Sequence, residues 1–442
     1  MSKRAVIWTI VIVVVLNLVV GMRVYDAYAV ESSEDDVYAN VSVFTRALML
    51  IRQDYVDEEK VSYKDLTYNA LKGMLSNLDP HSQFMEPVDF DEMQEDTKSE
   101  FGGLGIEISQ RGGLLTIVTP MEDSPASKAG LMSGDQITKI EGTPTEKLEP
   151  TEAVSKLRGK PGTKVTITVL RPETKEIKDY TITRDVIRVD SVRGKDLLQG
   201  PETNGYKIGY VRLTQFSEPT AKELGRRLDE LEEQGIQGLI LDLRNNPGGL
   251  LQSAIDVCGQ FVPANTMVVY TDGRSESARR EYRTKAMSDS KERLEYPIAV
   301  LTNNGSASGS EIVAGALKDL NRAIVVGETT FGKGSVQSVL PLPDSSAIRL
   351  TTAKYYTPSR KVIHERGVKP TIEAIMSPEA EVAMVRRRSY EALSEDEKKE
   401  VDQHDDIQME RAIDSLKGVL IFQKAKPPET KIMEKVEPDE EN

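Results

Sequence analysis

The chain has 442 residues, of which 38% are apolar and 29% are charged, with a formal net charge of −14. This length exceeds one ordinary domain, and the composition is that of a globular protein. The acidic balance argues against nucleic acid as the main partner. A single cysteine, Cys258, excludes an intrachain disulfide, and its apolar surroundings predict a buried structural thiol.

The N-terminus has the pattern of a targeting segment. Lys3 and Arg4 precede a mainly apolar run over residues 5–22, and Ala27-Tyr28-Ala29 offers a small-x-small cleavage site. Residues 1–29 are therefore expected to be either a signal peptide or a membrane anchor. The apolar run is long for a signal peptide and just long enough to span a bilayer. In both cases we expect an extracytoplasmic protein of the periplasm or cell envelope. If the segment is kept, residues 5–22 would anchor it in the inner membrane.

Residues 30–96 are expected to be helical. Val41, Phe44, Leu48 and Ile51 recur at helical spacing, and a second stripe of this kind spans 68–78. Such apolar stripes would suit a homodimer formed through the N-terminal helices.

Residues 97–188 change to short β runs with glycine punctuation, a β-rich module with two short helices. The opening loop, Gly103-Leu104-Gly105-Ile106, presents consecutive backbone N–H groups beside a strand. Such a loop suits a carboxylate, and the strand beside it could accept an added peptide strand. With Ala129-Gly130-Leu131 and Gly134-Asp135, the module resembles a PDZ domain. The alternative is a module that only spaces two other domains.

Residues 189–375 alternate strand and helix, which predicts an α/β core with mixed or parallel pairing. Four apolar runs are the expected strands: 208–213, 238–243, 297–301 and 323–326. Ser217 is expected to cap the helix that follows the first of them. The charged stretch 273–295 is expected to be a solvated excursion, and its position beside the expected site leaves a gating role open. Residues 376–423 are expected to be helical, and 424–442 to be a disordered acidic tail.

A serine-rich loop joins the third of these strands to a helix. A serine at such a turn exposes its hydroxyl beside the amides of a helix start, the setting of a nucleophile. Ser310 is a natural first-turn or capping residue, and Ser335 follows a later turn. Ser306 and Ser308 are both suited to the role, and the residues alone leave them tied.

A base for this nucleophile is best sought outside the three histidines. His404 and His81 lie in other segments, and His364 lies in a polar stretch. Lys333 stands between two glycines after an apolar strand, where desolvation would make its amine a general base. Gly248 and Gly249, with the amide after the nucleophile, could form an oxyanion hole.

Several long motifs then resemble the carboxy-terminal processing, or tail-specific, serine proteases. The likeness runs from about Val41 to Ile372 and has five further parts besides the PDZ loop: Leu78-Asp79-Pro80-His81-Ser82, Asp242 to Gly249, Gly305-Ser306-Ala307-Ser308, Gly332-Lys333-Gly334 and Tyr355-Tyr356-Thr357-Pro358.

The resemblance implies a role for each site residue. Ser308 would be the nucleophile, Lys333 the base, and Gln337 the residue that orients the lysine. The oxyanion amides would be those of Gly309 and a glycine of the 248–249 pair. Gly309 stands where the family commonly has alanine, and activity is expected to survive because only its amide is needed. A flat strand would not bring Lys333 and Gln337 to one face, so a turn or bulge is expected there.

The expected architecture is therefore multidomain α/β: an N-terminal helical segment, a PDZ-like module before an α/β protease core, and a helical C-terminal segment. The expected function is an extracytoplasmic endopeptidase that recognises free C-termini of protein substrates through its PDZ domain and cleaves by a Ser-Lys acyl-enzyme mechanism. No metal or other cofactor is implied. Arg158 is a candidate for coupling the PDZ domain to the core. The alternative is that its side chain is simply solvated. The rival functions are a non-proteolytic PDZ scaffold at the membrane and a Ser-His-Asp protease.

Overall fold

The computed structural model describes residues 37–425, with gaps at 112–113, 122, 149, 173, 287–292, 294, 389 and 391–392. The expected signal or anchor segment at 1–29 and the expected tail beyond residue 425 lie outside the described residues. The chain forms two compact units whose boundary falls between Pro80 and His81. Within the described ranges, every helix is too short or too polar to cross a membrane.

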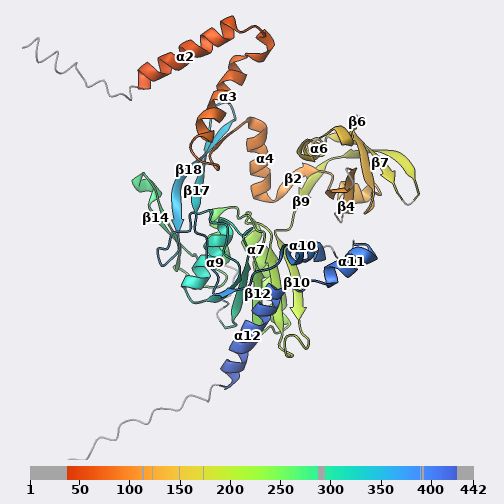
Figure 1. The fold of residues 1–442 in the computed structure, drawn as a ribbon, viewed down its shortest axis with the longest axis vertical. Helices are drawn as coiled ribbons and strands as arrows, with labels where there is room; N and C mark the ends of the chain where they lie inside the picture. The colour runs from red at the N-terminus through yellow and green to blue at the C-terminus, as the bar shows by residue number, and fades with distance from the viewer. Residues whose placement is uncertain are drawn as a thin grey trace, which may run out of the picture. The chain divides into compact units, whose positions relative to one another are not determined.

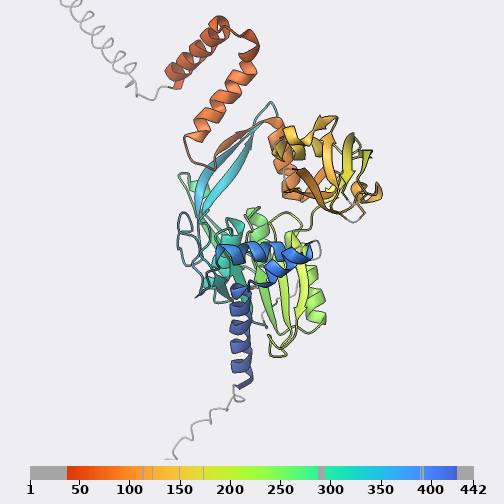
Figure 2. The same ribbon diagram turned by 45° about the vertical axis from the view of Figure 1, so that its right-hand side comes forward.

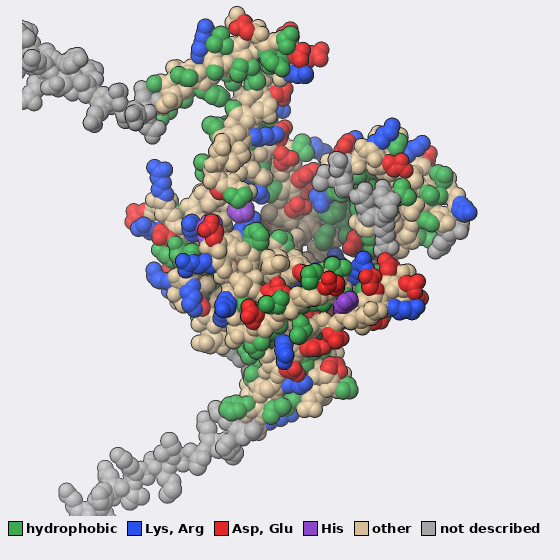
Figure 3. All heavy atoms as spheres, in the orientation of Figure 1, with side chains coloured by type: hydrophobic (Ala, Val, Ile, Leu, Met, Phe, Trp, Pro, Cys, Tyr) green, Lys and Arg blue, Asp and Glu red, His purple; other side chains and the backbone are tan. Residues whose placement is uncertain are grey.

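The first unit contains the two helices predicted from their apolar stripes (Figure 1). They are α2 (Val37–Asp54) and α3 (Tyr63–Ser76), joined by the 3-10 turn η1 (Glu58–Lys60). No residue of α2 is buried, and the side chains of Val41, Phe44 and Ile51 are 54%, 45% and 46% exposed. Apolar side chains are visible along this helix in Figure 3. The stripe of α2 is therefore uncovered within the described chain.

The second unit begins with a strand where the sequence predicted only helix. Strand β1 (Gln83–Met85) pairs with β18 (Ala347–Tyr356) of the core, and helix α4 (Pro87–Lys98) follows. The prediction of a helical region over 30–96 missed this strand for a local reason. Pro80 disfavours helix in the residue before it, and Pro87 starts a new helix at its first turn. Only a short extended segment fits between them.

The β-rich module has a five-stranded path in the order β3-β4-β5-β7-β8, and β6 pairs with β5. Its elements are β3 (Ile106–Arg111), β4 (Leu114–Pro120), α5 (Pro125–Lys128), β5 (Gln136–Ile140), β6 (Thr143–Pro144), η2 (Thr145–Lys147), α6 (Pro150–Leu157), β7 (Lys164–Arg171) and β8 (Glu176–Thr183). The core of the module holds the fully buried Ile117, Ile137 and Ile167. Strands β2 (Glu100–Gly103) and β9 (Asp185–Arg188), which flank the module, pair with each other. Strand β3 is an edge strand.

The core is built on a six-stranded sheet in the order β10-β11-β12-β15-β16-β19, parallel except for the β10–β11 pair. Its strands are β10 (Val192–Leu198), β11 (Ile208–Leu213), β12 (Gly238–Asp242), β15 (Ile298–Thr302), β16 (Ala323–Gly327) and β19 (Ile372–Glu373). The four strands expected from apolar runs are confirmed. Every residue of β12 and β15 is buried, as expected for strands covered on both faces.

Helices cover both faces of this sheet (Figures 1 and 2). On one face pack α7 (Thr220–Glu233), α8 (Leu251–Cys258) and α9 (Gly309–Asp319), with Cys258 fully buried among them. Burial raises the pKa of the Cys258 thiol to about 12, so this thiol is inert, as predicted. On the other face, Leu416 and Leu420 of α12 (Ile407–Ala425) pack against Ile240 and Leu301 of the sheet.

A second sheet joins β1, β18, β13 (Met267–Asp272) and β14 (Arg280–Arg283), and β17 (Ser335–Pro341) also pairs with β18. The 3-10 turn η3 (Glu276–Ala278) lies between β13 and β14. The stretch 273–295 is thus not simply solvated. It contributes a strand, and the side chain of Arg293 is 1% exposed and pairs with Glu232 at 2.8 Å. Attraction to acidic residues of α7 explains its burial.

The cap expected at Ser217 is also corrected. Helix α7 begins at Thr220 with Pro219 as N-cap, and the Ser217 N–H donates to the Thr220 hydroxyl oxygen at 2.9 Å. The proline limits the chain to a later helix start.

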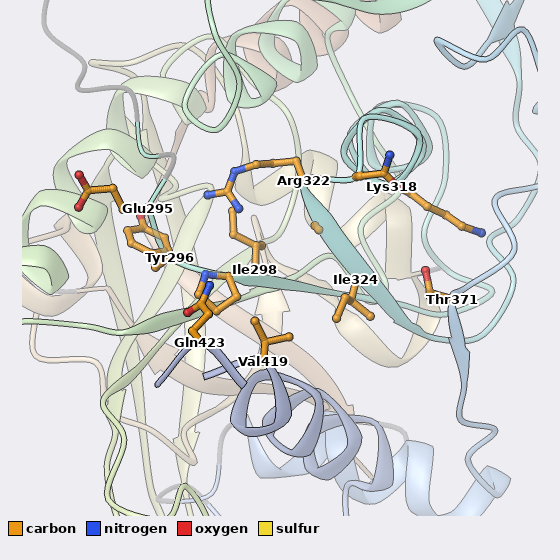
Figure 4. A pocket seen from close by; sticks show the side chains of 12 residues that line it. Glu295, Tyr296, Ile298, Lys318, Arg322, Ile324, Thr371, Val419 and Gln423 are labelled. Carbon is orange, nitrogen blue, oxygen red and sulfur yellow. The ribbon is translucent and has the colours of Figure 1, made fainter. Parts of the chain in front are cut away.

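The C-terminal segment is helical, as predicted. It consists of α10 (Pro378–Arg387), α11 (Glu395–Asp402) and α12. A pocket of about 480 Å³ lies between α12 and the starts of β15 and β16 (Figure 4). The serine loop and Lys333 follow the opposite, carboxyl ends of these two strands, so this pocket is not the predicted site.

Candidate active site

Ser308 lies between strand β15 and helix α9, as the sequence predicted for a nucleophile. It is the N-cap of α9 and has φ 52° and ψ −109°, a conformation that L-residues rarely adopt. Such backbone strain costs about 1–3 kcal/mol and concentrates at functional turns. The side chain is partly exposed. The chain thus holds Ser308 at a sharp turn with its hydroxyl reachable.

The neighbouring serines Ser306 and Ser310 are fully buried, and their hydroxyl groups donate hydrogen bonds to backbone carbonyl oxygens. The Ser306 hydroxyl donates to the Leu243 carbonyl oxygen at 2.8 Å, and that of Ser310 to the Asn246 carbonyl oxygen at 2.9 Å. Ser335 is 2% exposed. Of the four candidates, Ser308 therefore has the most accessible position.

The two glycines of the predicted oxyanion loop differ in their hydrogen bonding. Gly248 has φ 99° and lies so close to the nucleophile that an added Cβ would come within 2.6 Å of the Ser308 Cβ. Its N–H donates to Asn246 Oδ1 at 2.9 Å. Within the described chain, the N–H groups of Gly249 and Gly309 donate to no acceptor. These two amides are the better candidates for holding an oxyanion.

Lys333 lies in the loop between β16 and β17, where glycines allow close packing. A Cβ on Gly334 would come within 2.1 Å of the backbone nitrogen of His364. Burial lowers the pKa of the Lys333 ammonium, the Arg349 charge lowers it further, and Glu311 opposes both. Among the described residues, the Lys333 side chain has no hydrogen-bond or ion-pair partner. It is a half-buried amine whose ammonium has a pKa below the usual value of lysine.

Gln337 lies next to a strand irregularity, and the expected bulge is confirmed. The register with β18 shifts between Val336 and Gln337. Gln337 Nε2 donates to Ser335 Oγ at 3.1 Å and to Thr351 Oγ1 at 2.8 Å. Its Oε1 is buried and has no hydrogen-bond partner. The structure thus leaves unpaired an oxygen that could accept a hydrogen bond from an amine, and no hydrogen bond joins Gln337 to Lys333 in the described chain.

Glu311 is the principal residue that the sequence reasoning missed. Its buried carboxylate accepts the Ser308 N–H at 2.8 Å, and its other oxygen accepts the Thr330 hydroxyl at 2.5 Å and the Gly332 N–H at 2.7 Å. The Lys333 N–H also contributes to lowering the pKa of this carboxyl, while burial, the larger effect, raises it. One side chain therefore ties the Ser308 turn to the loop that carries Lys333. The capping-box spacing of a serine and a glutamate three residues apart was the available signal.

A buried ionic network supports the strand that leads to the oxyanion loop. Arg244 is 2% exposed; its Nη2 lies 2.8 Å from Asp242 Oδ2, and its Nη1 lies 2.8 Å from Asp406 Oδ1. Asp406 immediately precedes α12. In α10, Glu381 Oε1 accepts the Asn303 amide at 3.1 Å, beside the serine loop. The C-terminal segment thus reaches both loops of the site, which the sequence did not reveal.

The histidines provide no alternative base in the described chain. His364 lies beside the lysine loop, but its Nδ1 is buried without a partner and its Nε2 is 3.9 Å from the exposed Glu365 carboxylate. His404 lines a cavity between α10 and α11. His81 lies at the start of the second unit, and its carbonyl oxygen accepts from Arg349 at 3.3 Å. No hydrogen bond joins any of the three to Ser308. The described residues also contain no group of three or more His, Cys, Asp or Glu that could hold a metal ion.

The predicted carboxylate loop precedes the edge strand β3. Gly105 has φ 71°, and a Cβ there would come within 2.3 Å of the Ser124 Cβ, so glycine is required. Gly103 ends β2, and Ile106 begins β3. In the described chain, the N–H groups of Leu104 and Gly105 donate to no internal acceptor. Free amides beside an open strand edge are what a peptide carboxylate would need.

Arg158 is not simply solvated. It follows α6, its guanidinium carbon is 4.4 Å from the centre of the Phe101 ring, and its Nη1 is 3.4 Å from Asp96 Oδ1 in α4. It therefore contacts the segment that connects the core to the module, and not the Ser308 site itself.

Comparison with known proteins identifies the family. Residues 207–374 match peptidase family S41, and residues 116–171 match the PDZ domain. A carboxy-terminal-processing protease of Bartonella bacilliformis is 40% identical over 350 residues, which cover 77% of this chain and 76% of the relative. The chain belongs to peptidase family S41. Within that family it is a carboxy-terminal processing serine protease with a PDZ domain ahead of its protease domain, so the expected family, fold class and enzyme class are confirmed.

A second relative and a solved structure are also similar to this chain. The carboxy-terminal processing protease CtpB of Bacillus subtilis is 38% identical over 335 residues, which cover 76% of this chain and 67% of the relative. Among solved structures, the photosystem II D1 C-terminal processing protease is 30% identical, with a TM-score of 0.44 over 75% of this chain and 92% of that one.

Proposed function

We propose that this S41 peptidase is an extracytoplasmic endopeptidase that cleaves protein substrates through an acyl-enzyme on Ser308, with Lys333 as general base. One observation carries the assignment. The buried Glu311 carboxylate ties the strained Ser308 turn to the backbone beside Lys333, whose amine has a lowered pKa and no partner in the described chain. A reachable hydroxyl and a desolvated amine on two linked loops supply the nucleophile and base that acyl transfer requires.

The proposed chemistry follows from these groups. Neutral Lys333 takes the Ser308 proton as the hydroxyl oxygen attacks the scissile carbonyl, and returns it to the leaving amine. The free N–H groups of Gly249 and Gly309 would stabilise the oxyanion, with Gly248 packed behind the nucleophile. Water activated by Lys333 would then release the acyl group. The unused Gln337 Oε1 would accept a hydrogen bond from the Lys333 amine and so orient it.

The PDZ module would recognise the free C-terminus of the substrate. We propose that its carboxylate binds the amides of the 103–106 loop while the peptide adds to the edge of β3. Family members of this type are named for processing at a carboxy terminus, which agrees with a domain that reads that end of a substrate.

Contacts around Arg158 supply a route from this module to the oxyanion loop. Asp96, the partner of Arg158, lies in α4, and the next residue, Thr97, accepts the Glu218 N–H at 3.1 Å. Two residues before Glu218, the Phe216 N–H donates to the Gly248 carbonyl oxygen at 2.9 Å. We propose that peptide binding acts on the site along this chain of contacts.

The central test compares cleavage of an unfolded protein by the wild type, Ser308→Ala and Lys333→Ala. Both variants should lose at least about a hundredfold in kcat/KM while keeping the wild-type melting profile. The exposed Ser277→Ala and Lys369→Ala serve as matched controls and should keep full activity. Equal cleavage by Lys333→Ala would refute the dyad. A wild type that binds C-terminal peptides but never cleaves would favour the scaffold, and loss of activity only on substitution of His364 or His81 would favour a histidine base.

The remaining proposals concern place and assembly. We propose that residues 1–29 direct the chain across the cytoplasmic membrane and that, if kept, residues 5–22 anchor it there. The exposed apolar stripe of α2 supports a homodimer through the N-terminal helices. We place the PDZ domain at 97–188, the protease core at 189–375 and the helical C-terminal segment at 376–423, limits that controlled proteolysis would test. Cell fractionation tests the location, and light scattering of the protein with and without residues 37–54 tests the dimer.

A further inference from the structure

A cavity of about 650 Å³ lies beside the core sheet, apart from the serine loop, and basic residues gather around it. Arg193 of β10, Arg212 of β11 and Arg388, which caps the end of α10, all line it. Arg212 is on the same face of β11 as Tyr210, because side chains two residues apart in a strand point to the same side. Three elements thus bring guanidinium groups to one cavity.

The pairing of the strands makes this arrangement unfavourable for the empty protein. Arg193 and Arg212 are directly opposite each other in the antiparallel register of β10 and β11. Like charges in this relation destabilise a sheet. Burial lowers the pKa of Arg212, and the positive charge of Arg388 lowers it further. The charge of Arg193 also lowers the pKa of Arg212, while Asp242 and Tyr210 oppose these effects.

No carboxylate of the described chain makes an ion pair with Arg193, Arg212 or Arg388, although the charge of Asp242 acts on Arg212 and Arg388 from a distance. Within the described chain, the side chains of Arg193 and Arg212 make no hydrogen bond or ion pair, and Arg212 Nε is buried without a partner. Arg388 makes only a contact of 3.2 Å from Nη2 to Met384 Sδ. Arg193 is exposed, but Arg212 and Arg388 are partly buried. Partly buried guanidinium groups rarely lack an acceptor, because desolvating a charge is costly unless it is paired.

The nearby carboxylates are occupied or exposed. Asp242 faces Arg212 across β11 and β12, but it already accepts Arg244 and the Tyr210 hydroxyl. Asp406, which also lines the cavity, binds Arg244 through both oxygens, at 2.8 and 2.9 Å.

Two further acidic residues, Glu107 and Asp196, line the cavity and are exposed. Neither pairs with the three arginines. An anion from outside the chain would supply the acceptor that the described residues do not give to Arg212 and Arg388.

We propose that this cavity binds a small molecule bearing a phosphate group, held by Arg193, Arg212 and Arg388. Guanidinium forks match the geometry of phosphate oxygens, and a dianion balances several positive charges better than a single carboxylate. The volume is in the range of small-molecule sites and exceeds what a bare ion would fill. The soluble phosphate ester and the phospholipid headgroup share this chemistry.

The first test titrates the full chain with sodium phosphate by calorimetry, against sodium chloride at equal ionic strength. Saturable binding near one phosphate per chain is expected, and Arg212→Gln and Arg388→Gln should weaken it about tenfold or more. The matched control is Arg386→Gln, an exposed arginine of the same helix that pairs with Glu400 and should bind phosphate normally. Absence of saturable binding, or equal binding by Arg212→Gln, would overturn the proposal.

Melting temperatures measured with and without phosphate separate a loss of phosphate binding from a loss of folding. If the arginines await a ligand, Arg212→Gln should melt no lower than the wild type without phosphate, because a repulsion is removed. Phosphate should then raise the melting temperature of the wild type and not of this variant. A variant that melts much lower without phosphate would assign the arginine a structural role instead.

The source of the phosphate is resolved with glycerol 3-phosphate and with vesicles of phosphatidylcholine with or without phosphatidylglycerol, using protein that lacks residues 1–29. Recruitment to the anionic vesicles that Arg212→Gln abolishes would identify a lipid headgroup. Binding of glycerol 3-phosphate without recruitment would identify a soluble ester. Recruitment that survives Arg212→Gln, without binding of either soluble phosphate, would refute the site.

Discussion

Replacing Glu311 with glutamine should impair catalysis far more than it alters the shape of the side chain. The carboxylate receives the Ser308 N–H on one oxygen and the Thr330 hydroxyl and Gly332 N–H on the other. Glutamine offers one oxygen and one NH₂ group. Whichever way the amide turns, an N–H donor of the protein then faces another donor.

The magnitude follows from the number of bonds lost. The glutamine oxygen can keep the hydrogen bonds from Thr330 and Gly332. The Ser308 N–H then loses a charge-assisted hydrogen bond worth about 1.5–3 kcal/mol. That energy is comparable to the ~1–3 kcal/mol strain of the Ser308 turn, so the turn can relax away from its reactive conformation. A loss of about 2–3 kcal/mol in the transition state corresponds to a fall of roughly 30- to 150-fold in kcat.

The assay is steady-state cleavage of an unfolded protein, with thermal unfolding followed in parallel. The decrease should appear mainly in kcat, because Glu311 is fully buried behind the turn and does not reach the substrate. Glu410→Gln, on an exposed position of α12, is the matched control. If Glu311→Gln folds and cleaves within about threefold of the wild type, the carboxylate does not hold the nucleophile and the reasoning fails.

Three further predictions follow from the same site. Arg349→Gln removes a charge that lowers the pKa of Lys333, so the rise of kcat/KM with pH should move up by about 0.5–1 unit; a limb that stays or moves down in the pH–rate profile would contradict this. Gly248→Ala places a Cβ against the nucleophile and requires φ 99°, so activity should fall at least about a hundredfold, measured by the same cleavage assay. Asp406→Asn weakens a buried pair with Arg244, and chemical denaturation should show a loss of about 3 kcal/mol; an unchanged midpoint would refute a supporting role for this contact.

Local sequence patterns predicted most of the fold because its main strands and helices appear in the sequence as apolar runs and apolar stripes. The fully buried strands β12 and β15 are continuous apolar runs, and the helices of the first unit follow apolar stripes. Strand β1 escaped prediction because three residues carry no periodicity, and its partner Arg349 lies far along the chain from Gln83. Short strands of this kind are specified by their tertiary pairing and not by propensity.

The site shows the same division. The residues alone left Ser306 and Ser308 tied because both occupy one loop, and the difference between them arises from the Leu243 carbonyl, 63 residues away, which binds the Ser306 hydroxyl. Only one part of the role of Glu311 could be predicted from the sequence. Its cap of α9 is a local pattern, whereas its bond to Gly332 joins segments 21 residues apart and requires the fold. Arg244 and Asp406 are 162 residues apart, and no local pattern connects them.

In the site, the backbone is held by hydrogen bonds, whereas the side chains of Lys333 and Gln337 are not paired with each other. This difference indicates what substrate binding has to supply. The backbone of the site is already assembled, since Glu311 holds the Ser308 turn and the Phe331 N–H donates to the Ser306 carbonyl oxygen at 3.0 Å. The reacting side chains are not engaged: within the described chain, Lys333 has no partner and Gln337 Oε1 is unpaired. Small rotations of long side chains cost far less than refolding a loop. In the mechanism proposed above, we therefore expect a bound substrate to order the Lys333 amine between Ser308 and Gln337.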